Sequence, residues 1–226
     1  NKAVDKLVYF PVGKSDSYVV PATVGNIDVL NNRIYSELSI SFEEGSDKFV
    51  TVDGVSYTAD FKRLIACNKD KVGEFLIPST VDEIAENAFE NCTGLTSVEL
   101  PSGVTEISYA TFAGCTDLAE VKMPDSVKTI GDYAFIGCKS LGSIELSESL
   151  ETIGEFAFNS SGILSVDFPE SLKEIKRYSF FYTNLSRITG GENLKVIGEN
   201  AFFSTGIESV NISDSVESIG DSAFGL

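Results

Sequence analysis

The sequence of 226 residues contains no histidine, no tryptophan and a single methionine. Without histidine, neither a Ser-His-Asp nor a Cys-His catalytic system can form. The chain also has no glycine-rich phosphate loop and no calcium loop of the Asp-x-Asp-x-Asp-Gly type. Its 34 acidic residues are spread so widely that no one pair of carboxylates stands out as a catalytic pair. We therefore expect no enzymatic activity and no cofactor.

Basic residues are scarce: 17 Lys and Arg stand against 34 Asp and Glu, which gives a formal net charge of −17. Nucleic acids and anionic lipid surfaces are recognised by clusters of Lys and Arg, so neither is expected as a partner. No apolar run approaches the length of a membrane-spanning helix. No signal peptide is visible, but the chain begins at Asn1 rather than at methionine. We expect that a leader was removed from an exported protein.

What the chain does have is an internal repeat, visible in two independent columns of residues. Phenylalanine recurs in steps of 23, 23, 23, 22, 22 and 22 residues, and isoleucine keeps the same steps five positions earlier. A period of roughly 20 to 50 residues is typical of a repeat solenoid, in which each copy buries its apolar face only by stacking on its neighbours. The columns are Phe89, Phe112, Phe135, Phe158, Phe180, Phe202 and Phe224, and Ile84, Ile107, Ile130, Ile153, Ile175, Ile197 and Ile219.

Each copy contains one short run in which apolar and polar residues alternate, such as Val98-Glu99-Leu100, and proline or serine follows it. Alternation predicts a strand with one buried face, and proline ends such a strand. The next segment, Ile-x-x-x-Ala-Phe, is too irregular for a strand and too short for a long helix, so we predict a short 3₁₀ or α-helical turn. Stacked copies would then form one parallel sheet with about 4.8 Å between neighbouring strands. We call the turn of the solenoid that each copy forms a rung.

The cysteines follow the repeat. Cys92, Cys115 and Cys138 are 23 residues apart and occupy one repeat position, so their side chains should point the same way. A disulfide needs side chains that approach each other, and a zinc site needs ligands that converge. Cys67 has no partner outside this column. We predict four buried free thiols and no metal site.

The complete motif, Leu-x-x-Val-x-Leu-Pro-x-x-Val-x-x-Ile-x-x-x-Ala-Phe-x-x-Cys, resembles the bacterial leucine-rich repeat of the BspA-like, or treponemal, type. The resemblance implies a right-handed leucine-rich-repeat superhelix with one short parallel strand and one short helical or 3₁₀ turn in each repeat of 22–23 residues. Where more familiar leucine-rich repeats have asparagine, most copies have serine, whose hydroxyl can also bond the backbone. These positions are Gly103, Ser126, Ser149, Ser171, Asn193 and Ser215.

We divide the chain into an irregular, strand-rich first part of the solenoid, residues 1–74, and regular repeats, residues 75–226. The segment from Lys6 to Val24 aligns without a gap with the segment 57 residues later, and Ile27 and Ile84 keep the same offset. BspA-like proteins are similar here, because they also contain a longer unit with a Gly-Val-x-Tyr strand. The alternating residues 38–42 predict another strand. The alternative is that residues 1–74 form a small separate β cap.

Two sets of residues are candidates for binding a partner. The first set points outward from the predicted strands, the usual binding surface of this architecture. The second set is an aromatic column two residues before the repeated phenylalanine, with a further tyrosine beside it. Aromatic residues are frequent in binding hot spots; alternatively, these rings only shield the core. The sets are Glu99, Lys122, Glu145, Asp167, Arg187 and Asn211, and Tyr133, Phe156, Tyr178 and Tyr182.

Members of the BspA-like family are implicated in adhesion to host proteins and to other bacteria. The resemblance therefore implies a non-enzymatic, secreted or cell-surface module whose partner is a protein or a glycan, with host extracellular matrix proteins and mucin as candidates. Two other functions stay open. One is a structural spacer that holds a further domain away from the surface, and the other is a glycan-binding module that uses the aromatic column.

Overall fold

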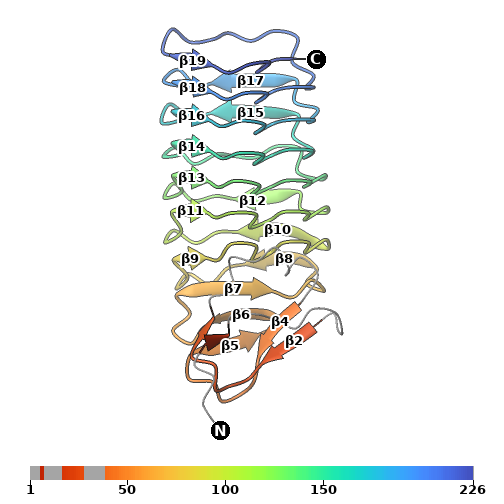
Figure 1. The fold of residues 1–226 in the computed structure, drawn as a ribbon, viewed down its shortest axis with the longest axis vertical. Helices are drawn as coiled ribbons and strands as arrows, with labels where there is room; N and C mark the ends of the chain where they lie inside the picture. Colours follow the sequence, from red (N-terminus) through yellow and green to blue (C-terminus); the bar gives the residue numbers. More distant parts are fainter. Residues whose placement is uncertain (1–5, 8–16, 28–38, 226) are drawn as a thin grey trace.

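The structure is a computed structural model that describes residues 6–7, 17–27 and 39–225. Within these ranges the chain forms 19 strands and no helix. Strands of successive repeats lie above one another along the long axis of the molecule, with the N-terminal part at one end and the last repeats at the other (Figure 1). The repeat predicted from the sequence is thus confirmed as a β-solenoid.

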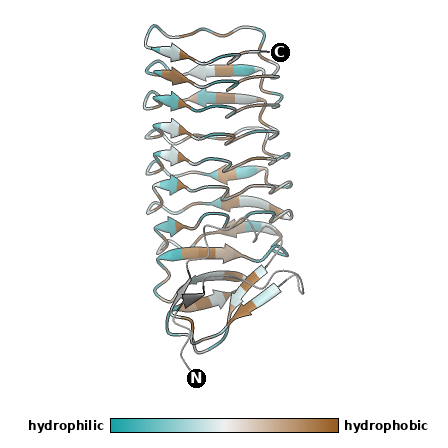
Figure 2. Ribbon diagram, in the orientation of Figure 1, coloured by the Kyte–Doolittle hydropathy of each residue, from teal (hydrophilic) through white to brown (hydrophobic). Residues whose placement is uncertain are grey.

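The predicted alternating strands form a first parallel ladder along one side of the solenoid. Its buried positions, such as Val98, Val121 and Val166, alternate with exposed polar ones, as the colouring of the strands shows (Figure 2). The ladder is interrupted at residues 143–146, which form no strand and follow Gly142, a residue without a side chain to pack in an extended run. Its strands are β8 (Gly73–Leu76), β10 (Leu95–Glu99), β12 (Glu120–Lys122), β15 (Ser165–Phe168) and β17 (Arg187–Gly190).

A second parallel ladder stands where the sequence predicted a helical turn, so the prediction of one strand per repeat and a single sheet was wrong. Each rung contributes two residues, the second of which belongs to the isoleucine column, and the six strands pair in an unbroken series. The strands are β11 (Glu106–Ile107), β13 (Thr129–Ile130), β14 (Thr152–Ile153), β16 (Glu174–Ile175), β18 (Val196–Ile197) and β19 (Ser218–Ile219).

The turn that follows each isoleucine is not helical, because its backbone N–H groups divide between two kinds of partner. Ala134 N donates to Gly131 O within the turn at 3.3 Å, whereas Phe135 N donates to Ala157 O of the next rung at 2.7 Å. Tyr133 has a positive φ of 61°, which a right-handed helix cannot contain. Bonds between rungs therefore replace the bonds of a helix.

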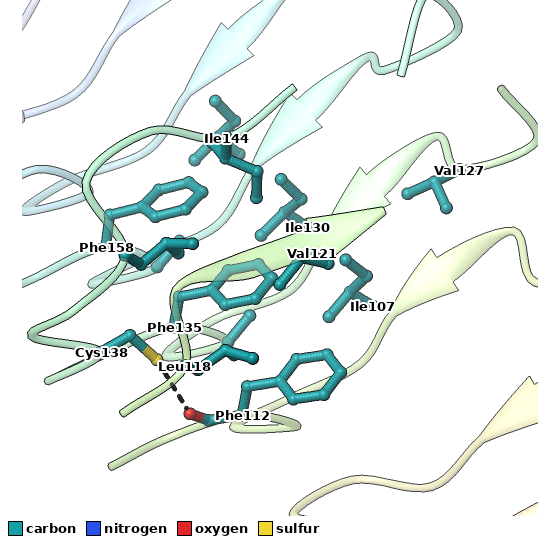
Figure 3. Close-up of a cluster of buried hydrophobic side chains, with 14 of the residues drawn as sticks. Ile107, Phe112, Leu118, Val121, Val127, Ile130, Phe135, Cys138, Ile144 and Phe158 are labelled. Carbon is teal, nitrogen blue, oxygen red and sulfur yellow. Dashed lines mark hydrogen bonds between the residues drawn. The ribbon is translucent and has the colours of Figure 1, made fainter. Parts of the chain in front are cut away.

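The phenylalanine column forms the centre of the core. Neighbouring rings stack with centroids 5.1 to 5.4 Å apart, from Phe89 to Phe224. Phe112, Phe135 and Phe158 are fully buried and point to one side, as predicted, among isoleucine and valine side chains from both ladders (Figure 3). Stacked rings contribute about 0.5–1.5 kcal/mol per pair beyond the burial of their area.

The three cysteines of the repeat column and three of the predicted serines bond the backbone of the preceding rung. All four cysteines are free and buried, and the Cys138 thiol donates to Phe112 O at 3.1 Å (Figure 3). Ser126 Oγ donates to Val104 O at 2.6 Å, and Ser171 and Ser215 make the equivalent bonds to Leu150 O and Leu194 O of their own preceding rungs. These thiol and hydroxyl groups donate to backbone carbonyls of neighbouring turns, as buried polar groups must. The contacts support a structural role for the cysteine and serine columns.

In the N-terminal part, a strand pairing repeats with the offset of 57 residues that the sequence alignment predicted. Strand β1 (Lys6–Leu7) pairs in parallel with β3 (Asn26–Ile27), and β7 (Arg63–Cys67) pairs with β9 (Glu83–Ile84) in the equivalent register. Val24 N donates to Pro21 O just as Val81 N donates to Pro78 O. Residues 8–16 of the alignment lie outside the described residues.

Two more strands, together with β7, connect this part to the repeats. β5 (Phe49–Val52) pairs antiparallel with β6 (Val55–Thr58), and β6 in turn pairs antiparallel with β7. Val55, Tyr57 and Leu64 belong to the main hydrophobic core of the repeats. A smaller core lies between these strands and the parallel pair formed by β2 (Ser17–Val20) and β4 (Ser39–Phe42), the strand predicted at residues 38–42.

Candidate functional site

The outward strand residues predicted as one binding surface are all exposed. The structure brings two of them into contact: Lys122 Nζ lies 3.6 Å from Glu99 Oε2 on the adjacent strands β12 and β10. Both side chains are more than half exposed, so this ion pair adds little stability. The contact does not by itself make a recognition site.

The other four outward residues do not form one continuous row. Arg187 lies two residues before Thr189, which is the residue paired with Asp167 and donates a hydrogen bond of 2.7 Å to Asp167 Oδ1. Glu145 and Asn211 lie in segments that form no strand. The predicted surface is therefore a set of separate polar groups on neighbouring rungs.

The predicted aromatic column, in contrast, is a continuous stack of rings. Tyr133, Phe156 and Tyr178 lie on consecutive rungs, with centroids 5.0 and 4.7 Å apart and interplanar angles of 13° and 5°. These three side chains are half-buried, whereas Tyr182 is 58% exposed. Phe181 connects Tyr182 to the stack, because its ring lies 5.2 Å from that of Tyr178 and 4.2 Å from that of Tyr182.

Further rings extend the stack at both ends. Tyr109 lies 5.4 Å from Tyr133, and Phe203 lies 5.4 Å from Phe181. Sequence reasoning missed Tyr109, because it is three residues before its phenylalanine rather than two, and Ala110 occupies the predicted column. We call the complete set the aromatic stripe: Tyr109, Tyr133, Phe156, Tyr178, Phe181, Tyr182 and Phe203.

Four rings of the aromatic stripe are attached to left-handed backbone. Tyr133, Phe156, Tyr178 and Tyr182 have φ values between 54° and 61°. This region is common for glycine and asparagine but is an outlier for a bulky side chain. The backbone turns this way in every rung, so the unusual feature is the choice of an aromatic residue at these positions.

A charged residue directly precedes each of the three central rings of the aromatic stripe in the sequence. Arg177 Nε lies 2.9 Å from Glu155 Oε2, and the hydrogen bond with Glu155 raises the pKa of the arginine. Asp132 accepts a hydrogen bond of 2.8 Å from Glu155 N and lies 3.7 Å from Lys176 Nζ. These acidic and basic groups compensate each other, so the edge of the aromatic stripe carries no block of one charge.

The described residues offer little for chemistry at a metal or a thiol. They contain no group of three or more Cys, Asp or Glu side chains that could hold a metal ion. Burial raises the pKa of the Cys115 thiol and raises that of Cys138 to about 12, and the hydrogen bond with Cys67 is the main cause that raises the pKa of Cys92. Protonated, buried thiols are poor nucleophiles. No helix that could cross a membrane occurs in the part of the chain that the structure describes.

Comparison with protein families matches the BspA type leucine rich repeat region, in six copies, to residues 65–122 and 105–225. A leucine-rich repeat protein of T. pallidum is 29% identical with a TM-score of 0.61, over 74% of this chain and 81% of that one. A protein of Bacteroides ovatus is 26% identical with a TM-score of 0.51, over 77% and 60% of the two chains. A protein of Eubacterium ventriosum is 20% identical with a TM-score of 0.62, over 93% and 58%.

This chain thus spans about three fifths of the length of the Bacteroides and Eubacterium proteins. A search of the curated proteins gives no match. The family match covers most of the chain, and its repeats coincide with the stacked rungs from β7 onward. Leucine-rich repeats are generally protein-binding modules. The chain belongs to the family of bacterial proteins with BspA-type leucine-rich repeats.

Proposed function

We propose that the chain is a non-enzymatic adhesion module, secreted or held at the bacterial cell surface, that binds a protein through the aromatic stripe. Host extracellular matrix proteins and the protein part of mucin are the partners to test first. The surface location rests on the resemblance to BspA-like proteins. It predicts that protease added to intact cells of the source organism removes the protein.

The observation that carries this proposal is the position of Tyr182. Its φ is 54°, and it occupies the repeat position that holds Asn91, Gly114, Gly137, Ser160 and Ser204 in the other copies, all small or tolerant of left-handed backbone. Such a conformation costs a bulky residue about 1–2 kcal/mol. A ring that is 58% exposed recovers little of this by burial. Backbone strain of this kind is common at functional sites, and tyrosine is common in hot spots.

The stacking geometry favours a protein over a glycan as the partner. A sugar that stacks on an aromatic side chain needs a free ring face. The faces of Phe156 are covered by Tyr133 and Tyr178, at 5.0 and 4.7 Å. Phe156 therefore presents its ring edge, which suits apolar and hydrogen-bonding contacts with a protein surface.

Substitution of Tyr182 by serine tests the proposal, because serine already occupies the same position at Ser160 and Ser204. Binding to immobilised matrix proteins and mucin should weaken at least about tenfold, as expected for a hot-spot residue. The melting temperature should stay the same or rise, since the strain is relieved. Leu164→Ser is the matched control, because Leu164 is 53% exposed and lies outside the aromatic stripe.

Four results would argue against the proposal. Unchanged binding by Tyr182→Ser would remove this residue from the site, and an equal loss in Leu164→Ser would indicate non-specific adsorption. Binding to mucin that disappears after enzymatic deglycosylation would favour the glycan-binding alternative. A loss of folding without any measurable binding would favour the structural spacer.

A further inference from the structure

A groove runs along the solenoid at the corner where each strand of the first ladder ends. It consists of two hollows, of about 530 and 610 Å³, which meet at Met123. Successive copies line it with equivalent residues, so it crosses the rungs at a right angle to the strands. We call it the corner groove. Its lining includes Leu76, Pro78, Leu100, Pro101, Met123, Pro124, Leu146, Phe168 and Pro169.

The N-terminal half of the corner groove is apolar. Leu76 occupies an outward strand position, where the other copies have polar residues, and its side chain is 68% exposed. Three prolines form the corner itself, and they contribute no backbone N–H. The charges in this half are Lys122 and Glu99, which pair with each other at 3.6 Å.

The C-terminal half has an apolar base and acidic sides. Glu145 and Asp167 share the repeat position that points outward, and four further acids occupy the repeat position three residues later. No Lys or Arg lines this hollow, and none of the ion pairs between described residues involves these six carboxylates. The four further acids are Asp125, Glu148, Glu170 and Glu192.

We propose that the corner groove binds an extended segment of a partner protein that is apolar at one end and rich in Lys and Arg at the other. The apolar end would cover Leu76, and the basic end would lie among the six carboxylates. The groove crosses six rungs, or five steps of about 4.8 Å, which equals about seven residues of extended chain at roughly 3.3 Å each. Lysine and arginine stems also pack on apolar surface, so they suit a base of Met123, Leu146 and Phe168.

This surface is separate from the aromatic stripe, so the proposal does not depend on the proposed function. Two independent properties define the occupant: exposed apolar area at one end and unneutralised negative charge at the other. Charge complementarity speeds association and selects against acidic segments. A purely basic ligand would leave Leu76 uncovered, and a purely apolar ligand would leave the six carboxylates without a cationic partner.

The test uses a fluorescein-labelled peptide of nine residues, with leucine at the first three positions, serine at the next two and lysine at the last four. A second peptide has the reverse order, because the groove does not define chain direction. Fluorescence anisotropy with the full chain should detect binding of one of them. Glu148→Gln with Glu170→Gln should weaken it about tenfold, as expected for two charge contacts. Leu76→Ser should weaken it several-fold.

The control variant removes the same amount of charge elsewhere. Glu106→Gln with Asp117→Asn replaces two exposed carboxylates outside the corner groove and should leave the affinity unchanged. Equal weakening in both double variants would indicate general attraction to an acidic protein and overturn the proposal. Equal affinity for a peptide with serine in place of leucine, or no binding of either peptide, would also overturn it.

Discussion

At the scale of single residues, a repeat position is defined by what it contacts on the rungs above and below. The phenylalanine column could be predicted from the sequence, because a buried ring must meet another ring one rung away. The backbone conformation of Tyr133 could not, since an aromatic residue does not favour a positive φ. The one available signal was asparagine at Asn87 and Asn200 in the same column, a residue that tolerates left-handed backbone.

The buried thiols predict a loss of stability at alkaline pH. Burial raises the pKa of Cys138 in the folded protein to about 12, whereas an unfolded thiol has a pKa of about 8.5. The folded state thus holds the proton more tightly. Its stabilising effect is complete below about pH 8.5 and is lost as the pH rises toward 12. Between pH 7 and 10 this one thiol should lower the free energy of unfolding by about 2 kcal/mol.

The measurement is chemical unfolding of the wild type and of Cys138→Ala at several pH values. The variant lacks the titrating group, so its free energy of unfolding should fall by about 2 kcal/mol less than that of the wild type over the same interval. The two neighbouring thiols, Cys92 and Cys115, still contribute in both proteins. Parallel curves for the two proteins would mean that Cys138 is not protected from ionisation in the folded state.

At the scale of elements, the alternating strands of the first ladder were predictable, and the two-residue strands of the second ladder were not. Two residues are too few to show a period of two, so Thr129-Ile130 carries no strand pattern. These short strands form because each donates and accepts backbone hydrogen bonds with the neighbouring rungs. Such bonds depend on the stacking of copies, so the sequence of one copy does not reveal them. Likewise, the outward residues of the first ladder were identified correctly as exposed, but the interruption at residues 143–146 separates them.

The close approach of rungs at the second ladder predicts different effects for two glycines. A Cβ atom on Gly154 would lie 2.5 Å from Gly131 C and 2.6 Å from Asp132 N, both in the backbone of the preceding rung. Gly154→Ala should therefore destabilise the protein by about 1–3 kcal/mol, because the rungs must separate. Gly142→Ala is the control, since a Cβ there meets nothing within 4 Å. Urea unfolding measures both, and equal effects would show that the rungs are not in tight contact at Gly154.

At the scale of the whole molecule, each rung contacts mainly the rungs beside it, so stability should be close to a sum over neighbouring pairs. Strands β6 and β7 connect the N-terminal part to this series, because Cys67 N donates to Ala88 O at 2.7 Å and Val55, Tyr57 and Leu64 belong to the main core. The sequence could indicate this connection through the 57-residue offset, because that offset preserves the pairing of β1 with β3 in β7 and β9.

If neighbouring rungs are interchangeable, one of them can be removed. Deletion of residues 151–172 joins Leu150 to Lys173 and keeps the repeat positions in order. Lys128 O now accepts hydrogen bonds from Glu151 N and Thr152 N, and Glu151 O accepts them from Lys173 N and Glu174 N. After the deletion, Lys128 O can accept the bonds from Lys173 N and Glu174 N. The shortened protein should fold in one transition, with a melting temperature lower by about 2–4 °C for each kcal/mol of lost rung contact.

Deletion of residues 151–161, half of the same rung, is the control. It places polar positions of one copy against buried positions of the next, so the shifted chain would expose apolar side chains and bury polar groups without partners. Circular dichroism and size-exclusion chromatography should find this variant unfolded or aggregated, while the variant without a complete rung stays monomeric and folded. If both deletions abolish folding, the rungs are not equivalent units, and the stability of the solenoid depends on contacts that extend beyond nearest neighbours.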